Sequence, residues 1–198
     1  MRTILALILL LFLSSCIEVA LLSGFTTTRI ATREKTLSDT KKDINIAAQI
    51  FKNFSQEGLK IPGNSIDITV NEGRVLLTGI VSQREMAKKA VDIAWRNKLA
   101  SEVINEIQIA KNKSKFNGFR TYFRDLAITT QIESRFFVTS NVSLLNVKVD
   151  TVNSVVYLIG VANTEYEIQK ITNLVSKIKG VRKVVSHIIT LDDDRRRI

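Results

Sequence analysis

The sequence predicts an α+β fold made of two tandem units, each with the element order αββαβ, a three-stranded sheet and two helices on one face of that sheet. The first observation behind this prediction is an internal repeat: DINIAAQIF at 43–51 matches DLAITTQIE at 125–133, and RVLLTG at 74–79 matches VVYLIG at 155–160. The second is that the spacing of apolar residues within each copy changes from helical to alternating and back.

The first copy covers residues 39–110. Its opening helix is predicted to be capped by Asp39 or Thr40 and to bury one face, with these residues on it: Ile44, Ala47, Ile50, Phe51 and Phe54. A hairpin follows, with alternating strands around the turn residues 71–74. Ser82 and Glu85 predict a capping box for a helix to about residue 98, and 103–109 form the last strand.

The second copy covers residues 120–191 and repeats each element. Its elements are a helix at 126–138, a hairpin at 145–149 and 155–159, a helix opened by Thr164 with Glu167 and closed by Gly180, and a strand at 181–191. Gly79 and Gly160 stand at equivalent positions, where a strand leads into the turn before a capping box. We interpret both as structural glycines, required by backbone conformation or by a close approach.

The N-terminal residues have the layout of an export signal. A positive end at Met1–Arg2 precedes an apolar run at 4–13, and Ser14, Ser15 and Cys16 follow it. The run is too short to span a bilayer. We predict a signal peptide at 1–15, because LSSC at 13–16 resembles a bacterial lipobox; a plain secretory signal is the alternative.

Under the lipobox interpretation Cys16 is the lipidation site, carrying diacylglycerol and an acyl chain. No other cofactor is expected. We expect residues 16–38 to form a flexible tether. An aspartate at position 17 would resemble an inner-membrane retention signal; this chain has isoleucine there, which favours the outer membrane. The domains would then face the periplasm.

Composition narrows the function further. The 198 residues include one His, one Cys and one Pro, which argues against zinc, iron–sulfur and haem sites built from His and Cys and excludes an intrachain disulfide. His187 has no catalytic partner motif, and no phosphate-binding loop is present, so we expect no enzyme and no catalytic or metal-binding residues. The net charge of +10 favours an acidic partner, and an envelope location makes that partner phospholipid rather than nucleic acid.

The element order, the glycines before the second helices and the lengths of both copies resemble the BON domain of bacterial envelope proteins. The resemblance is greatest in the second copy, at ITT (128–130), NVKV (146–149) and GV (180–181). It implies a protein of envelope integrity that binds anionic phospholipid through the first helix of the second domain and concentrates at the division site. We expect that phospholipid to be phosphatidylglycerol or cardiolipin. The resemblance also implies a tryptophan at position 127, where this chain has alanine.

The helix at 126–138 is therefore the predicted membrane contact. We expect Leu126, Thr129, Ile132 and Phe136 on its core side. The predicted phospholipid-binding residues are Arg120, Phe123, Arg124, Ala127, Ile128, Gln131, Arg135, Phe137 and Val138. A contact between the domains is the alternative use of this face.

The segment before that helix is a basic and aromatic linker at 111–119. With the residues up to 124 it contains five cationic and four aromatic side chains and no acid, which favours anionic headgroups. The alternative is that Phe119 and Phe123 begin the helix early and dock on a sheet. The tail at 192–198 is interpreted as a solvated, charged end.

The sequence thus predicts a membrane-anchored, non-enzymatic lipoprotein. An alternative function is that of a periplasmic chaperone or assembly scaffold, which would bind envelope proteins, including outer-membrane assembly machinery, through exposed sheet faces.

Overall fold

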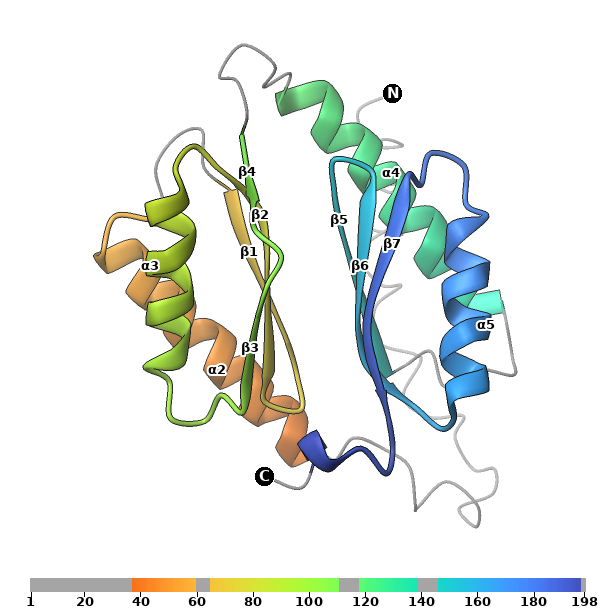
Figure 1. Ribbon diagram of the computed structural model, residues 1–198, viewed down its shortest axis with the longest axis horizontal. Coiled ribbons are helices and arrows are strands. Elements are labelled where there is room, and N and C mark those ends of the chain that lie inside the picture. The colour runs from red at the N-terminus through yellow and green to blue at the C-terminus, as the bar shows by residue number, and fades with distance from the viewer. Residues whose placement is uncertain (1–36, 60–64, 111–117, 139–145, 197–198) are drawn as a thin grey trace, which may run out of the picture. The chain divides into compact units, whose positions relative to one another are not determined.

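A computed structural model describes residues 37–59, 65–110, 118–138 and 146–196. Residues 35–198 form one compact unit, and it contains both copies of the predicted repeat (Figure 1). The predicted α+β fold with two αββαβ units is confirmed.

The first domain keeps the predicted order, except that its last strand is split in two. Its elements are α2 (Leu37–Gln56), β1 (Ser65–Asn71), β2 (Arg74–Val81), α3 (Arg84–Trp95), β3 (Glu102–Asn105) and β4 (Gln108–Ile109). Strand β2 lies in the middle, antiparallel to β1 and parallel to β3 and β4. The split comes from a local kink, where the side chain of Asn105 accepts a hydrogen bond from the backbone N–H of Ile107.

The second domain has the same topology with an unbroken last strand. Its elements are α4 (Gly118–Val138), β5 (Val147–Val152), β6 (Val155–Ala162), α5 (Glu165–Ser176) and β7 (Lys183–Thr190), followed by a short 3-10 turn, η3 (Asp194–Arg196). Strand β6 is antiparallel to β5 and parallel to β7.

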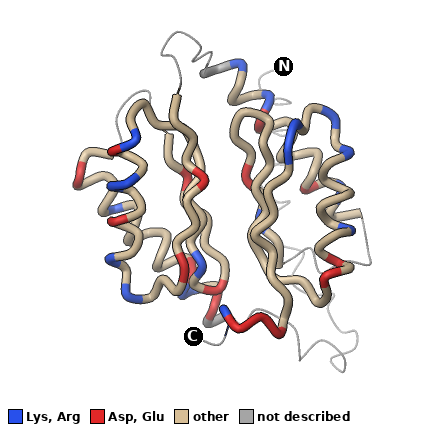
Figure 2. The backbone as a smooth tube through the Cα atoms, in the orientation of Figure 1, with Lys and Arg blue, Asp and Glu red and all other residues tan. Residues whose placement is uncertain are grey.

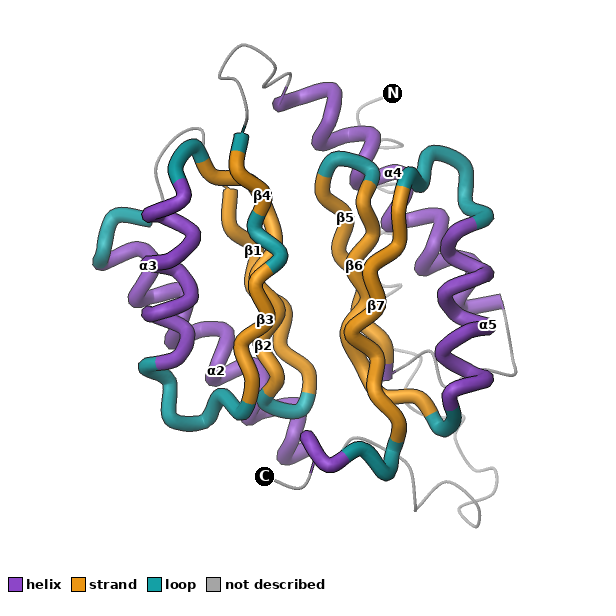
Figure 3. The backbone as a smooth tube through the Cα atoms, viewed as in Figure 1, coloured by secondary structure: helices purple, strands orange, loops and turns teal. Residues whose placement is uncertain are grey.

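Both helices of each domain cover the same face of their sheet, as predicted. One core is formed by α2 and α3 on the first sheet, with Ile50, Phe54 and Ile93 at its centre. The other is formed by α4 and α5 on the second sheet, around Ile132 and Ile171. Figure 3 shows these layers of helix and strand in each domain.

The helix starts follow the predictions only in part. Helix α2 already begins at Leu37, so Asp39 and Thr40 lie inside it rather than capping it. The predicted capping box at Ser82 is wrong: the N-cap of α3 is Gln83, which makes no side-chain cap. The box at Thr164 is confirmed, because Thr164 accepts a hydrogen bond from the Glu167 N–H and the Glu167 carboxylate accepts one from the N–H of Asn163.

The two sheets meet through the faces that the helices leave open. An apolar cluster joins Leu76 of the first sheet to Val155, Tyr157 and Ile159 of the second. These inner faces are therefore covered by each other. The alternative function of a chaperone, which requires exposed sheet faces, loses its binding surface in this arrangement.

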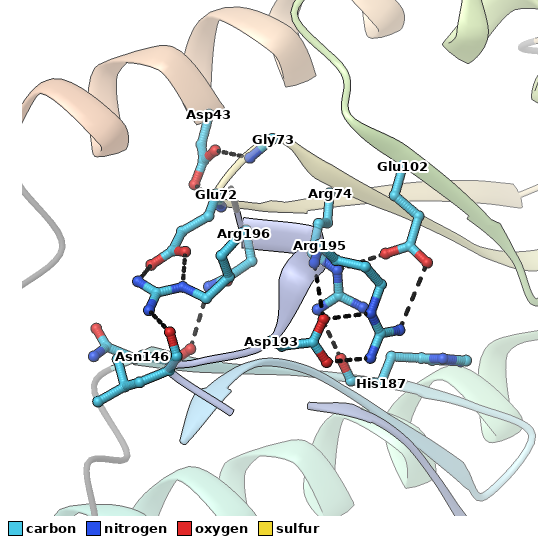
Figure 4. A network of polar contacts seen from close by, with 12 residues as sticks. Asp43, Glu72, Gly73, Arg74, Glu102, Asn146, His187, Asp193, Arg195 and Arg196 are labelled. Carbon is cyan, nitrogen blue, oxygen red and sulfur yellow. Dashed lines mark hydrogen bonds and ion pairs between the residues drawn. The ribbon is translucent and has the colours of Figure 1, made fainter. Parts of the chain in front are cut away.

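Polar contacts surround this cluster (Figure 4). Arg74, at the start of β2, is fully buried; its Nε donates to Glu102 at 2.6 Å and its Nη1 to the carbonyl oxygen of His187 at 2.9 Å. The ring of His187 lies 3.0 Å from the carboxylate of Glu106 in the other domain. His187 is thus a packed histidine of the domain interface.

The C-terminal segment joins this network through Arg196, whereas Asp192, Asp194 and Arg195 of the charged tail are exposed. Arg196 donates to both carboxylate oxygens of Glu72 at 2.8 and 3.1 Å, which links the end of the chain to the first hairpin. Arg195 pairs with Asp193 at 2.7 Å and lies 3.9 Å from Glu102. We call residues 192–196 the C-terminal clasp.

Candidate lipid-binding helix

The rotation of α4 about its axis is set by an aspartate that sequence reasoning missed. Asp125 is buried and accepts hydrogen bonds from the backbone N–H groups of Asn153 and Ser154, at 2.7 and 2.9 Å. These are the two central residues of the β5–β6 turn, and both have a positive φ, 52° and 63°. A hairpin turn in which both central residues have a positive φ costs free energy when neither of them is glycine. The two hydrogen bonds to the Asp125 carboxylate offset part of that cost.

The first domain contains the same arrangement. Asp43 of α2 accepts from the N–H groups of Glu72 and Gly73 at 3.0 and 2.9 Å. The signal in the sequence was the aspartate that opens both DINIAAQIF and DLAITTQIE. The sequence pattern assigns neither aspartate a role, because a charged residue of an amphipathic helix usually faces solvent, whereas here both aspartates lie on the inner face.

The buried position of Asp125 shows that two of the predictions for α4 are wrong. Ile128 was predicted to contact lipid but is 1% exposed and belongs to the core, whereas Leu126, predicted in the core, is 47% exposed. The buried positions follow Asp125 at spacings of three, seven and eleven, namely Ile128, Ile132 and Phe136. In the first domain Ile44 and Phe51, both predicted on the buried face, are exposed for the same reason, and Ile46 takes the place of Ile44 in the core.

The remaining predicted lipid-binding residues all lie on the exposed side of α4. They are Arg120, Phe123, Arg124, Ala127, Gln131, Arg135, Phe137 and Val138. Phe137 is 93% exposed and Val138 is 76% exposed, which is unusual for large apolar side chains. The side chain of Phe123 is also half exposed and packs edge-on against Tyr122, with ring centroids 5.7 Å apart.

The exposed side is divided into two flanks. With about 100° per residue, Phe123, Leu126 and Phe137 fall on one flank, and Arg120, Arg124 and Arg135 fall on the other. Ala127, Gln131 and Val138 lie near the second flank. Apolar and cationic stripes side by side suit the boundary between acyl chains and headgroups. Figure 2 shows the positions of the charged residues along the chain.

Two alternatives raised by the sequence can now be compared with the structure. The domain contact is made by the sheets, and the main contacts of α4 are with β5 of its own domain. The helix does begin early, at Gly118. However, the half-exposed side chain of Phe123 is not docked on a sheet.

The two structural glycines are explained by close approach. A Cβ atom at Gly160 would lie 2.2 Å from the carbonyl oxygen of Asn146, and one at Gly79 would lie 2.1 Å from that of Ser65. Gly79 also has a φ of +112°, a conformation that side chains disfavour. At both positions the paired strand comes too close for a side chain.

Several predictions lie outside the described residues. They are the signal peptide at 1–15, Cys16, the tether up to residue 36, the linker at 111–117 and residues 197–198. None of the helices in the described part of the chain is long and apolar enough to cross a membrane.

The comparison with protein-family models identifies the repeat. The model of the BON domain matches residues 42–111 and 124–192. The chain belongs to the BON-domain family. The two matched ranges coincide with the two αββαβ domains of the fold.

Several known proteins are similar to a large part of this chain. An uncharacterized protein from the gshII 5′ region of Anaplasma centrale is 34% identical over 74% of this chain and 93% of its own length. The outer membrane lipoprotein DolP of Haemophilus influenzae is 28% identical over 92% of both chains. The osmotically inducible protein Y of Escherichia coli is 23% identical over 66% of this chain and 64% of its own.

Proposed function

We propose that this BON-domain protein is a non-enzymatic outer-membrane lipoprotein, anchored through Cys16 and facing the periplasm, and that it supports envelope integrity by binding anionic phospholipid through α4. The similarity to the lipoprotein DolP along almost the whole chain supports the anchor and the location. A role at the division site is supported by this resemblance alone.

The observation that carries the proposed lipid contact is the exposed side of α4. Phe137 and Val138 leave apolar surface in water, and burying it in the interface is favourable. Each of Arg120, Arg124 and Arg135 contributes about 1 kcal/mol near an anionic surface. Phosphatidylglycerol and cardiolipin supply such a surface, and tryptophan is not required at position 127 when Phe123 and Phe137 lie on the same side of the helix.

Flotation with vesicles tests this contact. Residues 35–198 form a compact unit, so that fragment can be used without the anchor. We expect it to float with phosphatidylglycerol vesicles at low salt, to float less at high salt, and to remain behind with phosphatidylcholine. At limiting lipid concentration Phe137→Asp should strongly reduce the flotation, and Arg135→Ala should weaken the binding about fivefold.

The matched control is Tyr166→Asp on α5, which changes a similarly exposed aromatic residue of the same domain. This variant should bind like the parent. If folded Phe137→Asp binds as well as the parent, α4 is not the contact. Ile128 is unsuitable as a probe because an aspartate there would disrupt the core.

The anchor has a separate test. The mature protein should begin at residue 16 and have the mass of a triacylated cysteine, and Cys16→Ala should leave the membrane fraction. A mature N-terminus elsewhere, without acyl groups, would refute the lipoprotein.

A further inference from the structure

The outer face of α3, in the first domain, contains a second group of exposed aromatic and cationic side chains. Helix α3 buries Ala87, Ala90, Ile93 and Ala94 against its sheet. Arg84, Lys88 and Trp95 fall on its opposite side and are exposed, and the exposed residues Lys98 and Leu99 follow directly. Trp95 is 52% exposed and is the only tryptophan of the chain.

These residues are separate from the contacts that hold α3 in place. Lys89 and Arg96, on another side of the helix, pair with Glu57 at 3.7 and 2.6 Å. The exposed acids Glu85 and Asp92 also lie on this outer face. Without the two cations that pair with Glu57, three cationic residues, Arg84, Lys88 and Lys98, stand against these two acids, so the face keeps a small positive balance. Folding of the domain leaves Trp95 partly in water, although burying an indole ring is strongly favourable.

The chemistry of this face fits a lipid surface. A tryptophan ring settles at the boundary between headgroups and acyl chains, and lysine and arginine beside it attract anionic headgroups. The face is that of a single helix, which can lie on a bilayer as an interfacial helix does.

Helices α3 and α4 belong to opposite outer layers of the domain pair. Helices α2 and α3 cover one face of the first sheet, and α4 and α5 cover one face of the second. The remaining faces of the two sheets meet in the shared apolar cluster. A flat bilayer in contact with α4 is therefore on the far side from α3.

We infer that the outer face of α3, centred on Trp95, is a second contact for anionic lipid, so that one molecule can hold two bilayers. This contact lies in the other domain and does not depend on the one proposed for α4.

The sole tryptophan makes the inference directly testable. Phosphatidylglycerol vesicles added to residues 35–198 should shift Trp95 fluorescence to shorter wavelength and protect it from acrylamide, and phosphatidylcholine vesicles should do neither. Lys88→Glu, which keeps the tryptophan, should weaken this response roughly thirtyfold. Lys183→Glu, an exposed charge reversal on strand β7, is the matched control and should leave the response unchanged.

Holding two bilayers is measured by light scattering. The parent fragment should cluster phosphatidylglycerol vesicles, while folded Lys88→Glu and Phe137→Asp should each still bind vesicles at high lipid concentration but cluster them much less. Full clustering by both variants would refute two contacts.

The outcomes separate this inference from the proposed function. If the fragment floats with anionic vesicles but Trp95 emission does not change, α3 is not a lipid contact and α4 remains one. If Phe137→Asp abolishes flotation and the Trp95 response together at saturating lipid, Trp95 has no contact of its own and the inference is wrong. If Phe137→Asp floats like the parent while the Trp95 response persists, α4 fails and α3 stands.

Discussion

The two BON domains share one backbone plan but differ where they face each other. The residue that follows the hairpin turn is Arg74 in the first domain and Val155 in the second, and both are buried at the interface. The first domain thus places an arginine at this position, where the second places a valine, while Lys148 and Asp150 of the second domain hydrogen-bond to Val70 and Thr78 of the first. The difference teaches that the repeat specifies the fold, while divergence at the facing positions specifies how the two domains pair.

The largest expected effect tests whether equivalent glycines are equally constrained. Gly160→Ala should lower the free energy of unfolding by about 2–3 kcal/mol, because its Cβ would overlap the backbone of Asn146. Gly79→Ala should cost about 1–3 kcal/mol more, because its φ of +112° is also unfavourable. Thermal unfolding of residues 35–198 measures both.

Gly58→Ala provides the control, since Gly58 has a φ of +72° but nothing within 4 Å of the added Cβ. It should cost about 1 kcal/mol. Equal losses at all three positions would show that close approach between the strands does not matter.

The next effect compares the two aspartates that hold the hairpin turns. Asp125→Ala should destabilise the protein by about 3 kcal/mol, because two buried N–H groups lose their acceptor. Asp43→Ala should cost about 1 kcal/mol less, since its turn contains Gly73, which adopts a positive φ easily. Urea unfolding measures the difference, and Glu133→Ala, an exposed acid on α4, should be nearly neutral.

A smaller effect tests the C-terminal clasp. Arg196→Gln removes the paired hydrogen bonds to Glu72 and should cost about 1 kcal/mol. The loss should shrink in high salt, which screens the ion pair. Lys183→Gln is the control, and a loss of stability equal to that of Arg196→Gln would mean that the clasp adds nothing.

The smallest effect concerns a carboxylate on β1. Partial desolvation of its carboxylate, followed by the nearby charge of Asp150, raises the pKa of Asp67 above its usual value, although the residue as a whole is exposed. The folded protein therefore holds this proton more tightly than the unfolded chain, and its charge at neutral pH is unfavourable to folding. Asp67→Asn should stabilise the protein at pH 7 by less than about 1 kcal/mol, since solvent screens the group.

The gain in stability from Asp67→Asn should disappear when the pH falls below the pKa of Asp67 in both the folded protein and the unfolded chain, because the carboxyl is then protonated in both. Thermal unfolding across this pH range measures it, with Asp92→Asn on α3 as the control. A gain that persists at low pH would point to another cause.

The sequence predicted the repeat, the element order and the placement of both helices on one face, because these follow from apolar spacing and turn residues. It failed at the rotation of α4, since Asp125 is a buried polar residue that pattern reasoning places outside. The pairing of Arg196 with Glu72 joins the C-terminal segment to the first hairpin across 124 residues of sequence, so no local pattern indicates it. The exposure of Arg135, Phe137 and Val138 agrees with the expectation, because these residues lie on the far side of the helix whichever neighbouring residue is buried.

The break between β3 and β4 affects how readily a strand of another molecule can pair with this edge of the first sheet. In the described part of the sheets, β3 and β4 form one border of the first sheet, and β7 forms the corresponding border of the second. An interrupted border is a poor template for a strand from another molecule, whereas the eight residues of β7 form a continuous one. Intermolecular strand pairing in concentrated samples is therefore expected to begin at β7, where the charge of Lys183 opposes it.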